Sequence, residues 1–270
     1  LLALLAALPA CSDDPTAPEF TPPRPATGAE KQVAALGNDF GLALLRTVGT
    51  GAPADASLCV SPLSVQIALT MALNGAAGET EAAMHATLAY GDLTMAEVND
   101  AFASLLDLLP AIDPEVRLAI ANSAWIRDDF PVHDPFTAAL ETSYDAAVRR
   151  VPFVPATVDT INGWIADHTD GHIDQLLDVI PPQTALYLVN ALALDAPWAV
   201  AFDPEATQAA DFHRADGVDV PCQLMSRTGR FDHLATDLFE AVDLPYGHGL
   251  LSMTVLLPRD GHTVDDVLAA

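Results

Sequence analysis

Basic residues are scarce in this sequence of 270 residues. Only 11 Lys and Arg stand against 37 Asp and Glu, which gives a formal net charge of -26. An acidic surface repels the phosphate backbone of DNA and RNA, so the composition disfavours nucleic-acid binding. The one basic doublet, Arg149 and Arg150, is too small to form a polyanion site. Solubility in a salty or oxidising exterior is the plainest explanation of the charge.

Short catalytic motifs, repeats and closely spaced metal ligands are also absent from the sequence. It contains no G-x-G-x-x-G, no P-loop, no H-E-x-x-H and no G-x-S-x-G. Cys59 and Cys222 have no Cys or His near them at zinc spacing, so no metal or other cofactor is expected. A hydrolase would have to use histidines that stand in no recognisable motif, and scattered histidines are usually surface residues. They are His85, His133, His168, His172, His213, His233, His248 and His262.

Cysteine is rare, and its first occurrence follows an apolar leader. Residues 1–10 have the length of a signal-peptide h-region and are too short to span a bilayer. Ala10 before Cys11 resembles a bacterial lipoprotein processing box, although Pro9 is unusual there and neither Met nor a basic region precedes the run. We expect export with Cys11 lipidated at the envelope. A plain secretory signal, or an incidental leader, remains an alternative.

Composition divides the rest of the chain into a tether and one folded domain. Residues 11–30 are rich in Pro, Thr, Asp and Ala, which predicts a flexible tether. About half of all residues are hydrophobic and no interior stretch has linker composition, so residues 31–270 are expected to form a single domain. An exported location would permit Cys59 and Cys222 to pair, but two free buried thiols are the default expectation.

Hydrophobic periodicity predicts helices early in the domain and strands late. Apolar residues at helical spacing follow residue 31, and Ser61 with Pro62 is typical of a helix start. The almost unbroken apolar run at 185–194 indicates a strand covered on both faces near the middle of a sheet. Further helices are expected at 79–89, 94–109 and 158–168, and further strands at 57–60, 121–128, 211–213, 218–224, 238–244 and 250–257. This order favours an α+β fold.

Four segments, in the family order, resemble the serpins. The first combines VSPLSV at 60–65 with NGAAGET at 74–80. INGWIADHTDGHIDQLL at 161–177 is similar to the serpin helix that lies across the main sheet, together with its exit. VNALALDAPWAVAFDPEAT at 189–207 is similar to the family's Asn-Ala-Ile-Tyr-Phe-Lys-Gly-x-Trp, and VDLPYGHGLLSMTVLLP at 242–258 fits two consecutive strands of the second sheet.

The sequence is therefore identified as a bacterial member of the serpin family. The resemblance implies a serpin-like α+β fold, with helices packed on a central mixed sheet and further antiparallel sheets. It also implies that residues 31–270 are the N-terminal two thirds of the domain and that the fold is incomplete at the C-terminus. Asp195, Ala196 and His172 differ from residues that are usual in the family, which affects local contacts rather than the fold.

The resemblance assigns three residues to places in the central sheet. Ser61 and Asn190 would lie in the shutter, where the central strands part, and Trp198 would lie in the breach at the top of the sheet. Both shutter residues are polar in apolar surroundings and need hydrogen-bond partners. The alternatives are a simple N-cap for Ser61, a satisfied core amide for Asn190 and an ordinary buried aromatic for Trp198.

The function implied by the resemblance is inhibition of serine or cysteine proteases. In that family a protease cuts an exposed loop, which inserts into the central sheet and traps the acylated enzyme. The inhibitor needs no catalytic residue, so we do not expect an enzyme, and we expect a monomer at full length. The bait loop would lie beyond Ala270. A non-inhibitory serpin-fold carrier or chaperone is the alternative.

Overall fold

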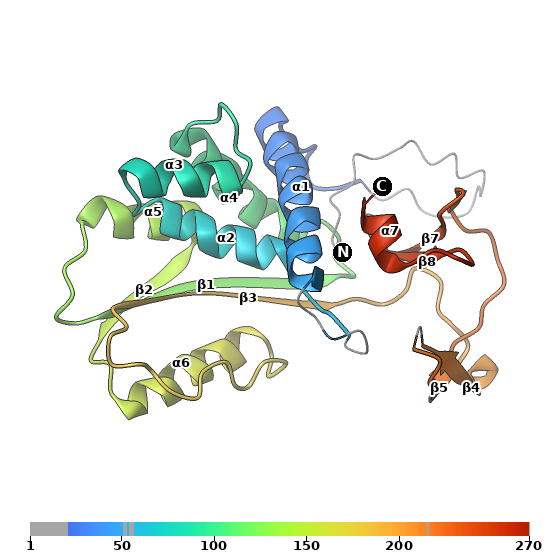
Figure 1. Ribbon diagram of the computed structural model, residues 1–270. Helices are drawn as coiled ribbons and strands as arrows, with labels where there is room; N and C mark the ends of the chain where they lie inside the picture. Colours follow the sequence, from blue (N-terminus) through green and yellow to red (C-terminus); the bar gives the residue numbers. More distant parts are fainter. Residues whose placement is uncertain (1–20, 51–52, 54–56, 215, 270) are drawn as a thin grey trace.

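The computed structural model describes residues 21–50, 53, 57–214 and 216–269. Helices and strands alternate irregularly along the chain, as Figure 1 shows. The helices are α1 (Gly28–Thr50), α2 (Pro62–Leu73), α3 (Gly78–Thr87), α4 (Met95–Leu108), η1 (Leu109–Ala111), α5 (Asp134–Tyr144), α6 (Pro155–His168), η2 (Pro204–Ala206) and α7 (Val264–Ala269). The strands are β1 (Arg117–Arg127), β2 (Ala146–Val151), β3 (Leu186–Asp195), β4 (Gln208–His213), β5 (Asp219–Leu224), β6 (His233–Ala235), β7 (Phe239–Tyr246) and β8 (Leu251–Pro258).

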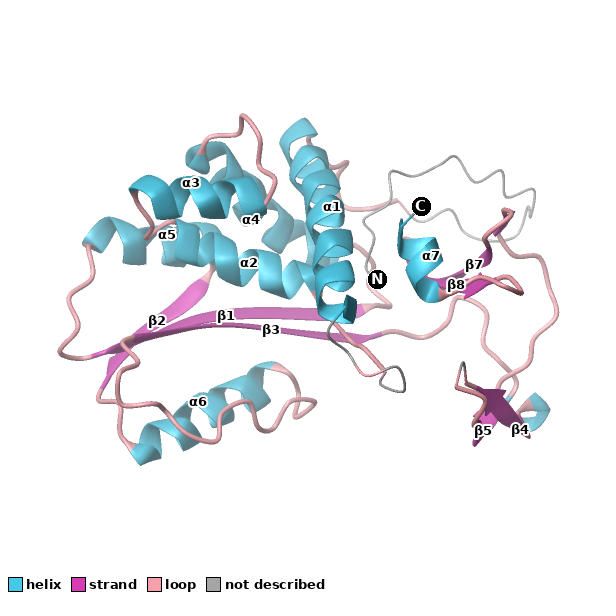
Figure 2. Cartoon of the chain, in the orientation of Figure 1, coloured by secondary structure: helices cyan, strands magenta, loops and turns pink. Residues whose placement is uncertain are grey.

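A mixed sheet with the order β2-β1-β3 forms the centre of the molecule. β2 runs parallel to β1, and β3 runs antiparallel to it. Helices α1 to α5 cover one face of this sheet and α6 crosses the other (Figure 2). Two small antiparallel sheets, β4-β5 and β6-β7-β8, lie beyond its end (Figure 1). This arrangement confirms the α+β expectation.

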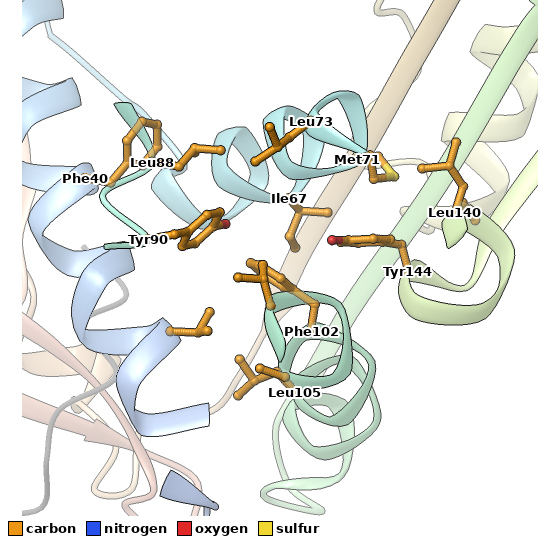
Figure 3. Close-up of a cluster of buried hydrophobic side chains, with 14 of the residues drawn as sticks. Phe40, Ile67, Met71, Leu73, Leu88, Tyr90, Phe102, Leu105, Leu140 and Tyr144 are labelled. Atoms are coloured by element: carbon orange, nitrogen blue, oxygen red, sulfur yellow. The ribbon is translucent and has the colours of Figure 1, made fainter. Parts of the chain in front are cut away.

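The larger core lies between the sheet and the helices above it (Figure 3). Ser61 and Pro62 start α2, which lies in the middle of this core. Its large apolar side chains all belong to the core or pack against it, namely Leu63, Val65, Ile67, Leu69, Met71 and Leu73. α1 crosses α2 closely at Gly41, where an added Cβ would lie 2.8 Å from the Pro62 ring. The helix begins at Gly28 rather than at residue 31, so the end of the expected tether belongs to the folded domain.

The place of β3 in the sheet differs from the sequence prediction. β1 occupies the middle, and the described residues supply no strand for the second edge of β3. The prediction of burial on two faces is confirmed, because Val189 and Ala191 pack beneath α6 while Leu188 and Leu192 face the larger core. An apolar run indicates that both faces of a strand are buried, and it does not indicate whether other strands pair with its edges.

Most of the remaining expectations are confirmed, with some exceptions. The predicted helices and late strands are present, whereas α5, β2 and β6 were not expected. The prediction of a strand at 57–60 is wrong, since no strand of the described part of the chain pairs with these residues. Cys59 is exposed and Cys222 half-buried, with no disulfide between them, which corrects the expectation of buried thiols. Among the described helices, none has the length and apolarity to cross a membrane.

Candidate functional site

A pair of asparagines joins the two long strands of the central sheet. Asn122 on β1 lies directly opposite Asn190 on β3, and the Nδ2 atom of Asn190 donates a hydrogen bond to Oδ1 of Asn122 at 2.8 Å. The Nδ2 atom of Asn122 in turn donates to the backbone carbonyl of Tyr144 at 2.8 Å. Asn122 is almost fully buried. Its amide therefore fixes the orientation of Asn190 and ties both strands to the end of α5.

The side-chain oxygen of Asn190 has no such partner. Oδ1 of Asn190 is buried and accepts no hydrogen bond from any described residue. A buried polar atom without a partner costs free energy, so native proteins rarely leave one unpaired. Asn190 belongs to β3, whose second edge is likewise unpaired in the described residues. Among the described residues, β3 thus combines a row of main-chain groups that no strand pairs with and an amide oxygen that lacks a donor.

A second group of polar side chains continues from Tyr144 into the helices. The Tyr144 hydroxyl donates to Oδ1 of Asn99 on α4 at 2.6 Å. Asn99 donates to Oδ1 of Asn74, the C-cap of α2, at 2.7 Å. Burial raises the pKa of Tyr144, so its hydroxyl stays protonated and remains a donor. Strand β3 is therefore connected through Asn122 and Tyr144 to three helices.

Ser61 lies at the N-cap of α2, where its side chain satisfies the first turn of the helix. Its Oγ accepts from the backbone nitrogen of Ser64 at 3.4 Å and donates to Oγ of Ser64 at 2.8 Å. The residue is exposed, and in the described part of the chain it makes no hydrogen bond to Asn190. α2 itself packs against β3. The assignment of Ser61 to a shutter stays a prediction.

Trp198 follows the end of β3 and packs on the β7-β8 hairpin. Its ring stacks on Tyr246 with centroids 4.6 Å apart and meets Phe202 edge-on at 5.6 Å. A β-bridge also pairs Trp198 with Tyr246. The tryptophan is half-buried and lies beyond the strand end rather than beside Asn190. Its assignment to the breach stays a prediction, and Cys11, the predicted lipidation site, lies outside the described residues.

Helix α6 covers the face of the sheet opposite to the larger core. Trp164 on α6 meets Trp125 on β1 edge-on at 6.3 Å and stacks on His168 at 4.1 Å. Asn162 fixes the segment that leaves the helix, because Oδ1 accepts from the backbone nitrogens of Leu176 and Leu177 at 3.0 and 2.9 Å. These bonds hold the segment after α6 against the helix.

The structure adds residues that sequence reasoning did not single out. Asn122 shows the same signal as Asn190, a polar residue within an apolar strand, and could have been found by the same argument. Its partner could not have been found, because the acceptor is the backbone carbonyl of Tyr144 and not a side chain. Asn99 belongs to a segment that was expected only to be a helix, and Asn74 is the first residue of the NGAAGET motif, which did not indicate its hydrogen-bond partners.

Known proteins resemble the chain both in sequence and in structure. The family model described as Serpin (serine protease inhibitor) matches residues 35–270. Ipis-1 of Ixodes persulcatus is 33% identical over 208 residues, which cover 74% of this chain and 54% of that protein. AtSerpin1 of Arabidopsis in its native stressed conformation has a TM-score of 0.81 at 25% identity, with 91% of this chain and 65% of that chain covered.

A third likeness is to reactive-loop-cleaved human thyroxine binding globulin. Its TM-score is 0.83 at 25% identity, and the match covers 89% of this chain and 72% of that one. The chain spans about half of the length of Ipis-1, so the match concerns the fold it shares with these proteins. The family match extends over most of the residues that form the central sheet and its helices. The chain belongs to the serpin family.

Proposed function

We propose that the protein inhibits serine or cysteine proteases as a suicide substrate, with β3 as the strand beside which the cut loop inserts. The family match is the observation that carries this activity, and Oδ1 of Asn190, which is buried on β3 without a donor among the described residues, supports the place of insertion. A strand added there would pair with main-chain groups that no described strand satisfies. A polar side chain on that strand could donate to Oδ1 of Asn190.

The chemistry requires no catalytic residue from the inhibitor. The nucleophile of the protease attacks a peptide bond in the exposed loop, forms an acyl ester (a thioester in a cysteine protease) and releases the new amino terminus of the loop. Insertion beside β3 then pulls the attached protease away and distorts it before water can cleave the ester. The driving force is the conversion of a metastable sheet into one with an additional paired strand.

The experiment expresses the protein from its natural gene, including whatever follows Ala270. Incubation with trypsin-, elastase- and subtilisin-like enzymes should give an SDS-resistant complex with at least one of them. Cleavage of the loop should also raise the melting temperature sharply. If every enzyme merely cuts the protein, with no complex and no gain in thermal stability, the inhibitory function is wrong.

A non-inhibitory carrier or chaperone is the second candidate. The likeness to thyroxine binding globulin favours it, because that protein has the same fold and is named for a ligand. The two functions differ in the hinge of the bait loop. Small residues there permit insertion, whereas bulky residues or proline block it, so the sequence that follows residue 270 distinguishes the two.

We further propose that the protein is exported and held at the cell envelope through Cys11, and that it is monomeric at full length. The apolar residues 1–10 and the proline-rich segment after Cys11 support the proposal. One acyl chain binds a membrane weakly and reversibly, so stable attachment needs a multiply acylated cysteine. The Cys11→Ala protein should appear in the soluble fraction, and wild-type partitioning of that variant would contradict the anchor.

A further inference from the structure

The tip of the β7-β8 hairpin lies against one end of the central sheet. β1 and β3 are antiparallel, so the start of β1 and the end of β3 meet at this end. The backbone nitrogen of Gly247 at the tip donates to the carbonyl of Pro197 at 2.9 Å, and Ala199 donates to the carbonyl of Pro245 at 2.9 Å. The hairpin is therefore attached to the chain that leaves β3.

A buried carboxylate attaches the same tip to the chain that enters β1. The Asp113 side chain is fully buried between η1 and β1. Its Oδ2 accepts from the backbone nitrogen of His248 at 2.7 Å, and its Oδ1 accepts from the His248 ring at 2.8 Å and from the Glu115 nitrogen at 3.0 Å. Gly247 has a φ of +49°, and an added Cβ there would lie 2.8 Å from Oδ2 of Asp113. The hairpin tip thus closes tightly over the carboxylate.

Among the described residues, the charged groups that face the His248 ring both come from the segment between η1 and β1. They are Asp113 and Glu115, whose Oε1 is 3.8 Å from Nε2 of His248. The hydrogen bond to Asp113 raises the pKa of His248, burial opposes the shift, and the two carboxylates add to it. Burial would raise the pKa of Asp113, but hydrogen bonds from His248 and the Glu115 backbone outweigh it and hold that pKa below its ordinary value.

The direction of the pH effect follows from these shifts. Because the pKa of His248 is raised on folding, its contribution is complete below the ordinary value of 6.5 and is lost as the pH rises through the folded value. The contribution of Asp113, whose pKa is lowered, is complete above its ordinary value of 3.8 and is lost as the pH falls. Both contributions are present between these limits.

We propose that His248 and Asp113 form a pH-dependent ion pair that attaches the β7-β8 hairpin to the end of the central sheet, closed in mild acid and weakened as the pH rises above the ordinary range of a histidine. This ion pair joins segments 135 residues apart in sequence. Its release would leave the hairpin held by the Trp198 stack and by the backbone bonds to Pro197 and Ala199. This device concerns the attachment of the hairpin and does not depend on protease inhibition.

The test measures amide hydrogen exchange of residues 246–251 between pH 6 and pH 8, with each rate divided by its intrinsic rate at that pH. In the wild-type protein, protection of these amides should fall by about two- to fivefold, the range expected for one partly exposed ion pair. The His248→Gln variant keeps a hydrogen-bond donor but does not titrate, so its protection should change little with pH. His133→Gln is the matched control, because His133 is the exposed N-cap of α5, and α5 lies at the opposite end of the molecule from the β7-β8 hairpin (Figure 1).

A second measurement needs no variant. The NMR titration of the His248 ring should give a higher pKa in the folded protein than in the same protein unfolded in urea. Equal or lower values in the folded protein would overturn the proposal. So would wild-type protection that is unchanged between pH 6 and pH 8, or a His248→Gln variant with the pH dependence of the wild type. A pH dependence that disappears in His248→Gln and persists in His133→Gln supports the proposed role of the His248–Asp113 ion pair.

Discussion

Replacement of Asn122 by alanine removes the residue that connects β1, β3 and α5. The change eliminates two hydrogen bonds of 2.8 Å and leaves two groups without partners, the Tyr144 carbonyl and Nδ2 of Asn190. An unpaired buried group costs about 1–3 kcal/mol, and Asn190 is half-buried, so water can partly compensate there. The free energy of unfolding should therefore fall by about 2–4 kcal/mol for both groups together.

Urea unfolding of the protein expressed from its natural gene, followed by circular dichroism, measures this loss. Asn38→Ala is the matched control, because Asn38 lies on α1 away from the strand pair. A double-mutant cycle with Asn190→Ala isolates the coupling between the two amides, which should exceed about 0.5 kcal/mol for residues in direct contact. Equal midpoints for Asn122→Ala and Asn38→Ala would refute the argument that this pair stabilises the sheet.

Three further outcomes are expected. The hydrogen bond from Arg24 lowers the pKa of Glu30 from 4.5 to about 2, burial opposes this shift, and hydrogen bonds from Ser104 and Thr27 assist it. The free energy of unfolding should therefore fall as the pH drops through this range, and the fall should be smaller in Arg24→Gln. An equal loss of stability in acid in the wild type and in Arg24→Gln would contradict this. Added NaCl should screen the repulsion that arises from the net charge of -26, and Tm should rise by roughly 2–4 °C for each kcal/mol of repulsion removed. An unchanged Tm between about 0.1 and 1 M NaCl would contradict this expectation. Residues 1–270 alone should inhibit no protease and aggregate through the edge of β3, which a soluble, monomeric preparation would disprove.

Sequence reasoning succeeded where a local pattern has a local cause. Ser61 and Pro62 start a helix because an N-cap side chain and a residue without N–H suit that position. Asn190 stood out because an amide within an apolar strand needs a partner, and the structure places Asn122 opposite it. The order of the motifs was sufficient to identify the family, whose model matches residues 35–270.

The rest depended on contacts between distant segments. Which strands pair with the two edges of β3 is set by distant segments, and its apolar run indicates only that its faces are covered. Asn122 binds a carbonyl whose position is set by the end of α5. His248 and Asp113 are 135 residues apart, and neither shows a sequence pattern that would pair it with the other. Arg24 falls within a stretch whose composition predicts a tether, yet it contacts Ser104 on α4.

Hydrogen exchange along β3, before and after the bait loop is cut, tests the central claim most directly. The claim is that the second edge of β3 receives the inserted strand. Cleavage by a protease that forms no lasting complex should increase the protection of every second amide from Leu186 to Asp195, because a new neighbour takes up the main-chain groups on that edge. Protection of β3 that stays the same after complete cleavage would contradict the account.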